Sequence, residues 1–141
     1  MASNKGRAFF ALYGYHFNPD DITHLLGIEP TSSNAAGAGS SLDKPVISSW
    51  EFSTDTIDGE TDEVDIYKLT EGLIKKLDPV KDKIIEASKN LNLSPRIGVV
   101  LELSVDKDET CPDVGFGART IRFLADIGAF INVDYKLSKR I

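Results

Sequence analysis

Hydrophobic residues alternate with other residues along four segments of the chain, as expected for β-strands. The clearest alternation lies at 97–105, where Ile, Val and Leu occupy every second position. The segment 7–15 carries aromatic and aliphatic residues on both faces, which is typical of a strand covered on two sides. Two further strands are predicted at 46–53 and 130–136, and each has one predominantly apolar face.

A short helix is predicted at 19–26 by signals at both of its ends. Asn18 is suited to cap the helix, and Pro19 occupies the first helical position, where no N–H group is needed. Gly27 follows the last apolar residue and is suited to a left-handed C-cap. The next segment, 29–41, is rich in Ser, Ala and Gly and is predicted to be a loop.

Apolar residues at helical spacing predict three more helices in the second half of the chain. The first spans 66–77, and Asp78 and Pro79 are expected to break it and to cap the next. The last spans 120–127, and its predicted inward-facing residues are Ile121, Leu124 and Ala125. The element order is therefore β-α-β-α-α-β-α-β within one domain of residues 1–141.

This order has a similar unit at each end, in which a strand, a loop, a short helix and a glycine precede another strand. It predicts an α+β fold with a ferredoxin-like antiparallel sheet built from two βαβ units. The helices are expected mainly on one face, with the apolar segments 7–15 and 96–105 central. Trp50 is expected in the core because it shares a strand face with Phe52, although a tryptophan can also anchor an interface.

The composition is acidic, and the negative charge is concentrated in one segment. The 141 residues include 16 Lys and Arg and 22 Asp and Glu, which gives a net charge of −6. Seven of the acidic residues fall between Glu51 and Tyr67 without any Lys or Arg, and the rest of the chain holds 15 acidic and 16 basic residues. Bulk charge of this sign disfavours nucleic-acid binding, because it repels phosphate groups.

The acidic segment has two interpretations, a solvated loop and a docking surface for a basic protein. Clustered charge steers association and disfavours wrong partners, which supports the second interpretation. The candidate partner-binding residues are Asp55, Asp58, Glu60, Asp62, Glu63 and Asp65, with Asp106, Asp108 and Glu109 as a possible second patch.

A different candidate site lies before the last helix. Gly115 and Gly117 precede a helix that contains Arg119 and Arg122, and glycines at a helix N-terminus can bind an anion. The alternative is a tight entry from loop to helix, for which glycine serves backbone geometry.

The sequence predicts no catalytic residues, no metal site and no cofactor. His16 and His24 are the only histidines, and the nearby Asp20 and Asp21 already suit the positive end of a helix. Cys111 is the only cysteine, so no internal disulfide forms, and its acidic neighbours disfavour a reactive thiolate. With no apolar run of membrane-spanning length, a cytoplasmic location without membrane association is expected.

Several short motifs along the chain resemble those of a bacterial family known only as domain of unknown function 4279. They are FNPDDI at 17–22, LGIEPT at 26–31, SSW at 48–50, LADIGA at 124–129 and VDY at 133–135. The resemblance spans nearly the whole chain and implies no catalytic residues.

Together these features favour a small binding protein over an enzyme. The leading hypothesis is an immunity protein that neutralises a bacterial toxin, for example a basic nuclease, by direct protein–protein binding. The alternative is a small-molecule-sensing regulatory domain with an anionic ligand near Gly115 and Arg122. The oligomeric state is left open by the sequence.

Overall fold

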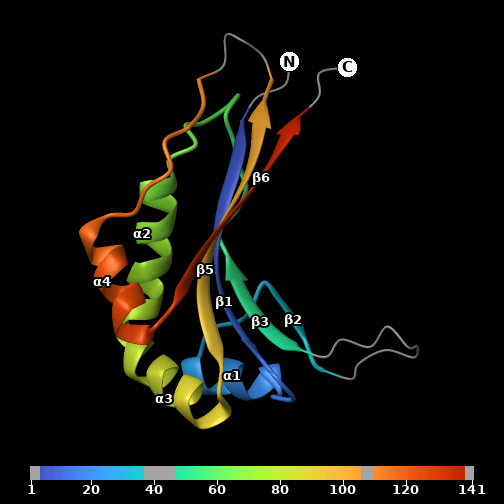
Figure 1. The fold of residues 1–141 in the computed structure, drawn as a ribbon, viewed down its shortest axis with the longest axis vertical. Coiled ribbons are helices and arrows are strands. Elements are labelled where there is room, and N and C mark those ends of the chain that lie inside the picture. Colours follow the sequence, from blue (N-terminus) through green and yellow to red (C-terminus); the bar gives the residue numbers. More distant parts are fainter. Residues whose placement is uncertain (1–3, 37–46, 106–109, 139–141) are drawn as a thin grey trace.

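A single mixed β-sheet runs the length of the molecule, with α2 and α4 on one face and α1 and α3 at one end (Figure 1). The computed structural model describes residues 4–36, 47–105 and 110–138. The described strands are β1 (Lys5–Gly14), β2 (Ser32–Asn34), β3 (Ser48–Ser53), β4 (Ile57–Asp58), β5 (Ser94–Ser104) and β6 (Phe130–Ser138). The helices are α1 (Pro19–Leu26), α2 (Ile66–Leu77), α3 (Lys81–Leu91) and α4 (Ala118–Ile127), with a 3₁₀ turn, η1 (Asp78–Val80), between α2 and α3.

The sheet order is β2-β3-β1-β5-β6, and β4 also pairs with β1. The predicted α+β class is confirmed, and the strands at 7–15 and 96–105 correspond to β1 and β5, each with neighbours on both sides. The ferredoxin-like arrangement of two βαβ units is not confirmed. Strand β1 is antiparallel to β3, and β5 is parallel to β6, so that β5-α4-β6 forms a βαβ unit of adjacent strands and β1-α1-β3 does not.

Helix α1 is much shorter than strand β1. Its eight residues span about 12 Å, whereas the ten residues of β1 span about 33 Å. The helix therefore cannot carry the chain back along the sheet, and β3 starts at the end where β1 stops. Helix α4 and the extended segment before it do return along the sheet, which makes β6 parallel to β5.

Two short strands lie where the sequence predicts only loops. Strand β2 falls inside the predicted loop 29–41 and pairs with β3, while β4 falls inside the acidic segment and pairs with β1. Strands of two or three residues have no hydrophobic period of their own, because they are too short to repeat it.

The capping signals of α1 are confirmed. The Asn18 side chain accepts a hydrogen bond of 3.0 Å from the Asp20 N–H, and Gly27 has a φ of +67°. Contrary to the prediction, Asp78 does not cap the start of the next helix, α3. It continues the helical backbone from α2 into η1, and its carboxylate instead accepts a hydrogen bond from Arg119.

The inward face of α4 differs from the prediction. Leu124 is buried as expected, but Ile121 and Ala125 are exposed. The buried residues of this helix are Thr120, Phe123, Leu124 and Ile127. Helix α4 packs against α2 and α3 on one flank, and the flank that carries Ile121 faces away from them.

The main core lies between the sheet and the helices, and Trp50 is fully buried in it, as predicted. Register places Trp50 opposite Leu12, on the face that also carries Phe10 and Phe52. The indole Nε1–H donates a hydrogen bond of 3.0 Å to the hydroxyl of Thr23 on α1. This bond satisfies the polar group that burial of a tryptophan brings into the core.

The opposite face of the sheet is covered by its own side chains. The Phe9 ring lies over Gly98, its partner on β5, where a Cβ atom would overlap the ring. The guanidinium of Arg7 lies 5.2 Å from the centre of the Phe9 ring, and that of Arg96 lies 4.3 Å from the centre of the Tyr13 ring. Cation–π contacts of this kind keep aromatic groups shielded without a second helix layer.

We predict that Thr23→Val destabilises the protein by about 1–3 kcal/mol, because the buried Trp50 N–H loses its only described acceptor. In a Trp50→Phe background, Thr23→Val should lower the free energy of unfolding by less than it does in the wild type, because no indole N–H then remains to lose its acceptor. Urea denaturation of the four proteins of this double-mutant cycle measures the difference. Equal costs in both backgrounds would show that the bond contributes nothing.

We also predict a loss of stability above pH 10.0 that depends on Tyr13. Burial raises the pKa of Tyr13 above its ordinary value of 10.0, the carboxylates of Glu51 and Asp134 act in the same direction, and Arg96 opposes them. The unfolded chain therefore loses the Tyr13 proton at a lower pH than the folded chain does. The stabilisation that protonated Tyr13 contributes is complete below pH 10.0 and is lost as the pH rises through the folded-state pKa. Denaturation at several alkaline pH values should show that the free energy of unfolding declines less steeply with pH for Tyr13→Phe than for the wild type. The same dependence on pH in both proteins would contradict the assignment.

Candidate functional site

The acidic segment folds as a tight turn at the end of the molecule where β1 begins. The Asp58 carbonyl accepts hydrogen bonds from the N–H groups of Thr61 and Asp62, and its carboxylate accepts one of 3.0 Å from the Glu60 N–H. Aspartate stabilises turns in this way because its short side chain reaches the backbone two residues ahead. The turn therefore fixes the path of the chain between β4 and α2.

The next stretch alternates between acidic and buried apolar residues. Val64 and Ile66 pack with β5 residues in a second core cluster, and Gly6 leaves room for Val64 against β1. Asp65 caps α2, because its carboxylate accepts a hydrogen bond of 3.1 Å from the Lys68 N–H. The acidic residues between and beside these anchors, Asp62, Glu63 and Asp65, form what we call the acidic ridge.

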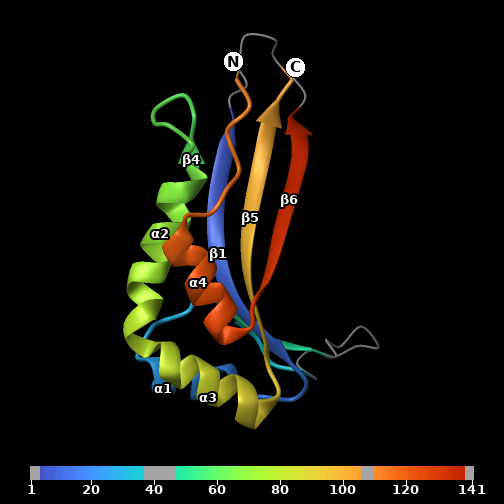
Figure 2. The same ribbon diagram turned by 60° about the vertical axis from the view of Figure 1, so that its left-hand side comes forward.

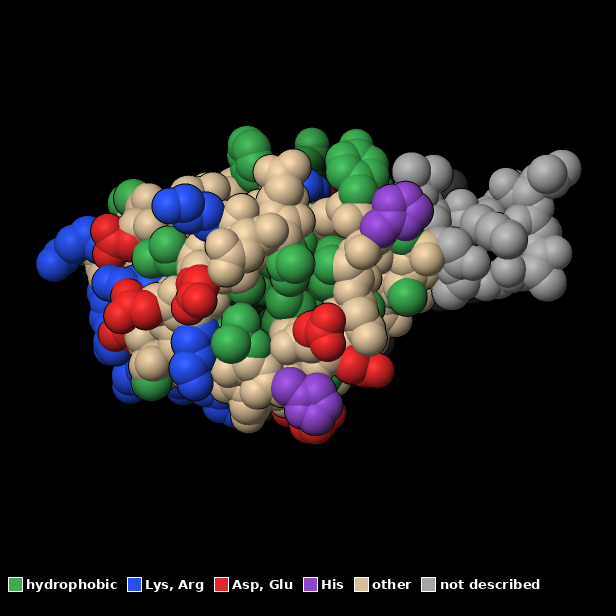
Figure 3. All heavy atoms as spheres, turned by 90° about the horizontal axis from the view of Figure 1, so that it is seen from below, with side chains coloured by type: hydrophobic (Ala, Val, Ile, Leu, Met, Phe, Trp, Pro, Cys, Tyr) green, Lys and Arg blue, Asp and Glu red, His purple; other side chains and the backbone are tan. Residues whose placement is uncertain are grey.

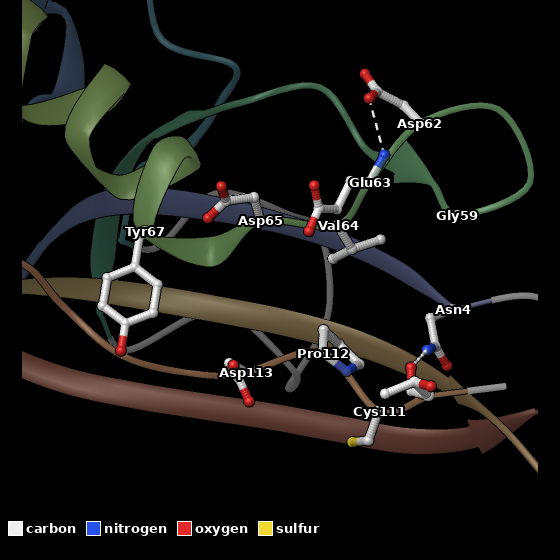
Figure 4. A pocket seen from close by; sticks show the side chains of 11 residues that line it. Asn4, Gly59, Asp62, Glu63, Val64, Asp65, Tyr67, Cys111, Pro112 and Asp113 are labelled. Atoms are coloured by element: carbon white, nitrogen blue, oxygen red, sulfur yellow. Dashed lines mark hydrogen bonds between the residues drawn. The ribbon is translucent and has the colours of Figure 1, made fainter.

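The acidic ridge separates two hollows of the surface. The first is a pocket of about 500 Å³, in which the ridge faces the segment after β5 (Figure 4). The second, of about 280 Å³, is bordered by the same three acidic residues together with Ile57 and Lys68. The remaining residues of the first pocket are Asn4, Gly59, Val64, Tyr67, Thr110, Cys111, Pro112 and Asp113.

The first pocket is strongly acidic. Four acidic residues line it, with Asp113 on the segment opposite the ridge, and the lining includes no Lys or Arg. The ridge residues Asp62 and Glu63 are exposed and Asp65 is half-buried, so that a cation from solvent or from a partner can reach them. Such an arrangement favours an ammonium or guanidinium group and repels anions.

Asn4 holds the two walls of this pocket together. Only 5% of its surface is exposed. Its amide donates a hydrogen bond of 2.7 Å to the Thr110 carbonyl and accepts one of 2.8 Å from the Ser104 N–H. Its backbone carbonyl accepts a third bond, of 2.7 Å, from the Gly59 N–H in the acidic turn.

The glycines before α4 are explained by close packing against α2. A Cβ atom on Gly115 would overlap the ring of Tyr67, and one on Gly117 would lie 3.3 Å from the Glu71 carboxylate. Arg119 already pairs with Asp78 at 3.3 Å, and Arg122 is exposed. These contacts favour the tight loop-to-helix entry, and an anion at Gly115, Gly117, Arg119 and Arg122 stays a prediction.

The structure brings together only part of the predicted partner surface. The ridge residues converge in one pocket, whereas Asp55 lies beside Lys76 in a separate hollow of about 360 Å³. Asp58 and Glu60 belong to the turn behind the ridge. The second predicted patch, Asp106, Asp108 and Glu109, lies outside the described residues.

Eight residues of the pocket lining were not predicted as part of a site, among them Asn4, Tyr67 and Asp113. Asp113 follows the acidic residues Asp106, Asp108 and Glu109 in the sequence, so it would have been included if that patch had been extended by a few residues. Asn4 and Tyr67 carry no such signal, because their role depends on contacts with residues far away in the chain.

The two histidines are exposed and lie well apart on the surface (Figure 3). Within residues 4–36, 47–105 and 110–138, no group of three or more His, Cys, Asp and Glu side chains is arranged to hold a metal ion. Over the same residues, every helix is too short or too polar to cross a lipid bilayer.

Comparison with known proteins places the chain in a family. The model of the family described as domain of unknown function (DUF4279) matches residues 4–138. The chain belongs to this family. The match confirms the resemblance seen in the sequence motifs, and the DUF4279 range contains every residue that lines the acidic pocket. No curated protein and no solved structure matches the chain.

We predict that Asn4→Ala loosens the wall of the pocket and lowers the free energy of unfolding by about 1–3 kcal/mol, because the Ser104 N–H and the Thr110 carbonyl lose a buried partner. Hydrogen exchange should show faster exchange of the Ser104 amide. The Gly59 amide is the internal control, because it bonds to the backbone of residue 4 and keeps that acceptor in the variant. Unchanged protection of Ser104 would show that Asn4 does not hold the wall.

Proposed function

We propose that this DUF4279 protein is a cytoplasmic binding protein that neutralises a basic protein partner, as an immunity protein neutralises a bacterial toxin by covering its active surface. The observation that supports this most is the first pocket, whose lining includes four acidic residues and no Lys or Arg. A basic side chain of a partner would exchange its hydration for charge-assisted hydrogen bonds there. Buried arginines in such pockets are frequent anchors of protein interfaces.

The shape of the site supports a protein partner over a small molecule. The acidic ridge borders hollows on both sides, so a protein surface that lies across the ridge can contact its residues from both hollows at once. Asp55 and Glu60 are exposed on either side of β4 and extend the negative field beyond the pocket. A broad field of one sign accelerates association with a partner of the opposite sign.

The chemistry of the pocket also supports binding rather than catalysis. Its lining contains neither a histidine nor a cationic group to stabilise developing negative charge, and acyl or phosphoryl transfer relies on such groups. A nuclease toxin fits this pocket, because a surface that binds nucleic acid is rich in Lys and Arg. Occupying that surface would block the substrate directly.

The test is a charge reversal on the ridge with a matched control. We expect Asp62→Lys with Glu63→Lys to slow association with the toxin, taken as the product of the neighbouring gene, by about tenfold or more. Asp82→Lys with Glu86→Lys changes the net charge by the same amount on exposed positions of α3 and should have a much smaller effect. Stopped-flow kinetics at several salt concentrations should show a steep salt dependence for the wild type and the α3 variant only.

A growth assay with the toxin gives an independent measurement. Cells that co-express the toxin should survive with the wild type and with the α3 variant, and should die with the ridge variant. If the ridge variant associates and protects as well as the wild type, the acidic ridge is not the docking surface and the proposal is wrong.

A further inference from the structure

Strand β6 forms a long free edge of the sheet. It pairs with β5 on one side, and no described strand pairs with its other side (Figure 2). Its nine residues, Phe130–Ser138, contain no proline or glycine that would interrupt pairing. Soluble proteins normally shorten, interrupt or cover such an edge, because its unpaired N–H and C=O groups are a template for another strand.

The apolar row of β6 is not covered by the helix layer. Ile131, Val133, Tyr135 and Leu137 share the face of the core residues Ile97, Val99 and Leu101, since they pair with β5 in register. Nevertheless Val133 is 41% exposed and Tyr135 is 70% exposed. This row is an uncovered continuation of the core face at the sheet edge.

Helix α4 leaves this edge open because its contacts are on the other flank. On that flank Phe123, Leu124 and Ile127 are buried in the core, and the Arg119–Asp78 and Asp126–Lys81 ion pairs lie at η1 and α3. Ile121 lies on the opposite flank and is 52% exposed.

The other face of β6 carries one acidic and one basic residue, two positions apart. Asp134 pairs in register with Val100, and Lys136 with Glu102, which places both on the open face of the sheet. The Lys136 ammonium lies 3.7 Å from the Glu102 carboxylate. Within the described part of the chain, Asp134 has no ion-pair partner.

We propose that a second copy of this chain pairs with β6 in antiparallel orientation, so that two sheets join into one continuous sheet across a two-fold axis at Tyr135. In this register Asp134 lies opposite Lys136 of the second copy, and the symmetry produces the same pair twice. Val133 lies opposite Leu137 of the second copy, and the two Tyr135 side chains meet at the axis. Directly opposed side chains in antiparallel strands are close enough to interact.

The charges of β6 select this register over its neighbours. An axis at residue 134 would place Asp134 opposite its own copy, and an axis at residue 136 would do the same for Lys136. Pairings centred between residues would set the apolar row of one copy against the polar row of the other. The charge pattern of β6 is therefore complementary to itself, which a two-fold interface requires. For this reason we expect a second copy of the chain, rather than an unrelated strand, at this edge.

The dimer and the proposed partner binding use separate surfaces. None of the residues that line the acidic pocket belongs to β6. The dimer can therefore be tested on the purified protein alone.

Charge exchange along β6 is the decisive experiment, with mass measured by light scattering or sedimentation equilibrium. We expect a dimer for the wild type, and a dissociation constant raised about tenfold or more by Asp134→Lys or by Lys136→Asp, because each places two pairs of like charges in contact. The double variant Asp134→Lys with Lys136→Asp restores opposite charges and should restore the dimer. Glu86→Lys on α3 is the control for net charge, and circular dichroism verifies that each variant is folded.

A cysteine at the axis tests the register directly. In a Cys111→Ser background, Tyr135→Cys should form an intermolecular disulfide on mild oxidation, whereas Val133→Cys, which faces Leu137 of the second copy, should do so much less. A wild-type protein that stays monomeric at high micromolar concentration would overturn the proposal. Three other results would also overturn it. The single reversals could leave the dimer as stable as in the wild type, the double exchange could fail to restore it, or Tyr135→Cys could fail to cross-link.

Discussion

Strand β1 has apolar side chains on both faces, and its backbone N–H and C=O groups point to both edges. Each of its four sides therefore requires a partner. Strands β3 and β4 pair with one edge and β5 with the other. The helices cover one face, while Phe9 lies over Gly98 on the other. At the start of the strand Asn4 continues the same pattern, since it bonds to the acidic turn on one side and to β5 and residue 110 on the other. The walls of the candidate site are thus extensions of the elements that β1 requires.

The elements with a full hydrophobic period could be predicted from the sequence. Strand β5 and helices α1 and α2 follow their patterns closely, and the ends of α1 coincide with Asn18 and Gly27, because caps are local interactions. Strand pairing is not local. The alternation in β3 is the same whether it pairs with β1 in parallel or antiparallel orientation, so the sequence pattern does not indicate the direction.

Burial on a helix is equally dependent on neighbours. Ile121 and Leu124 are both apolar and both within α4, yet only Leu124 is buried, because it lies on the flank that packs into the core with Phe123 and Ile127. The candidate site shows the same limit. Counting charges found the ridge residues, but the pocket also needs Asp113 and Asn4, and the Asn4 amide contacts a residue 106 positions further along the chain.

The contacts of Asn4 also have a consequence for synthesis. Asn4 is synthesised well before its hydrogen-bond partners, which follow it by 100 and 106 positions in the chain. Strand β1 pairs with β5 across a similar separation, so its second edge stays open during the same interval. Chains dominated by such distant contacts fold slowly, because a long loop must close before the contacts form. The end of the molecule that carries the acidic pocket is therefore assembled late, and an apolar first strand must remain soluble until then.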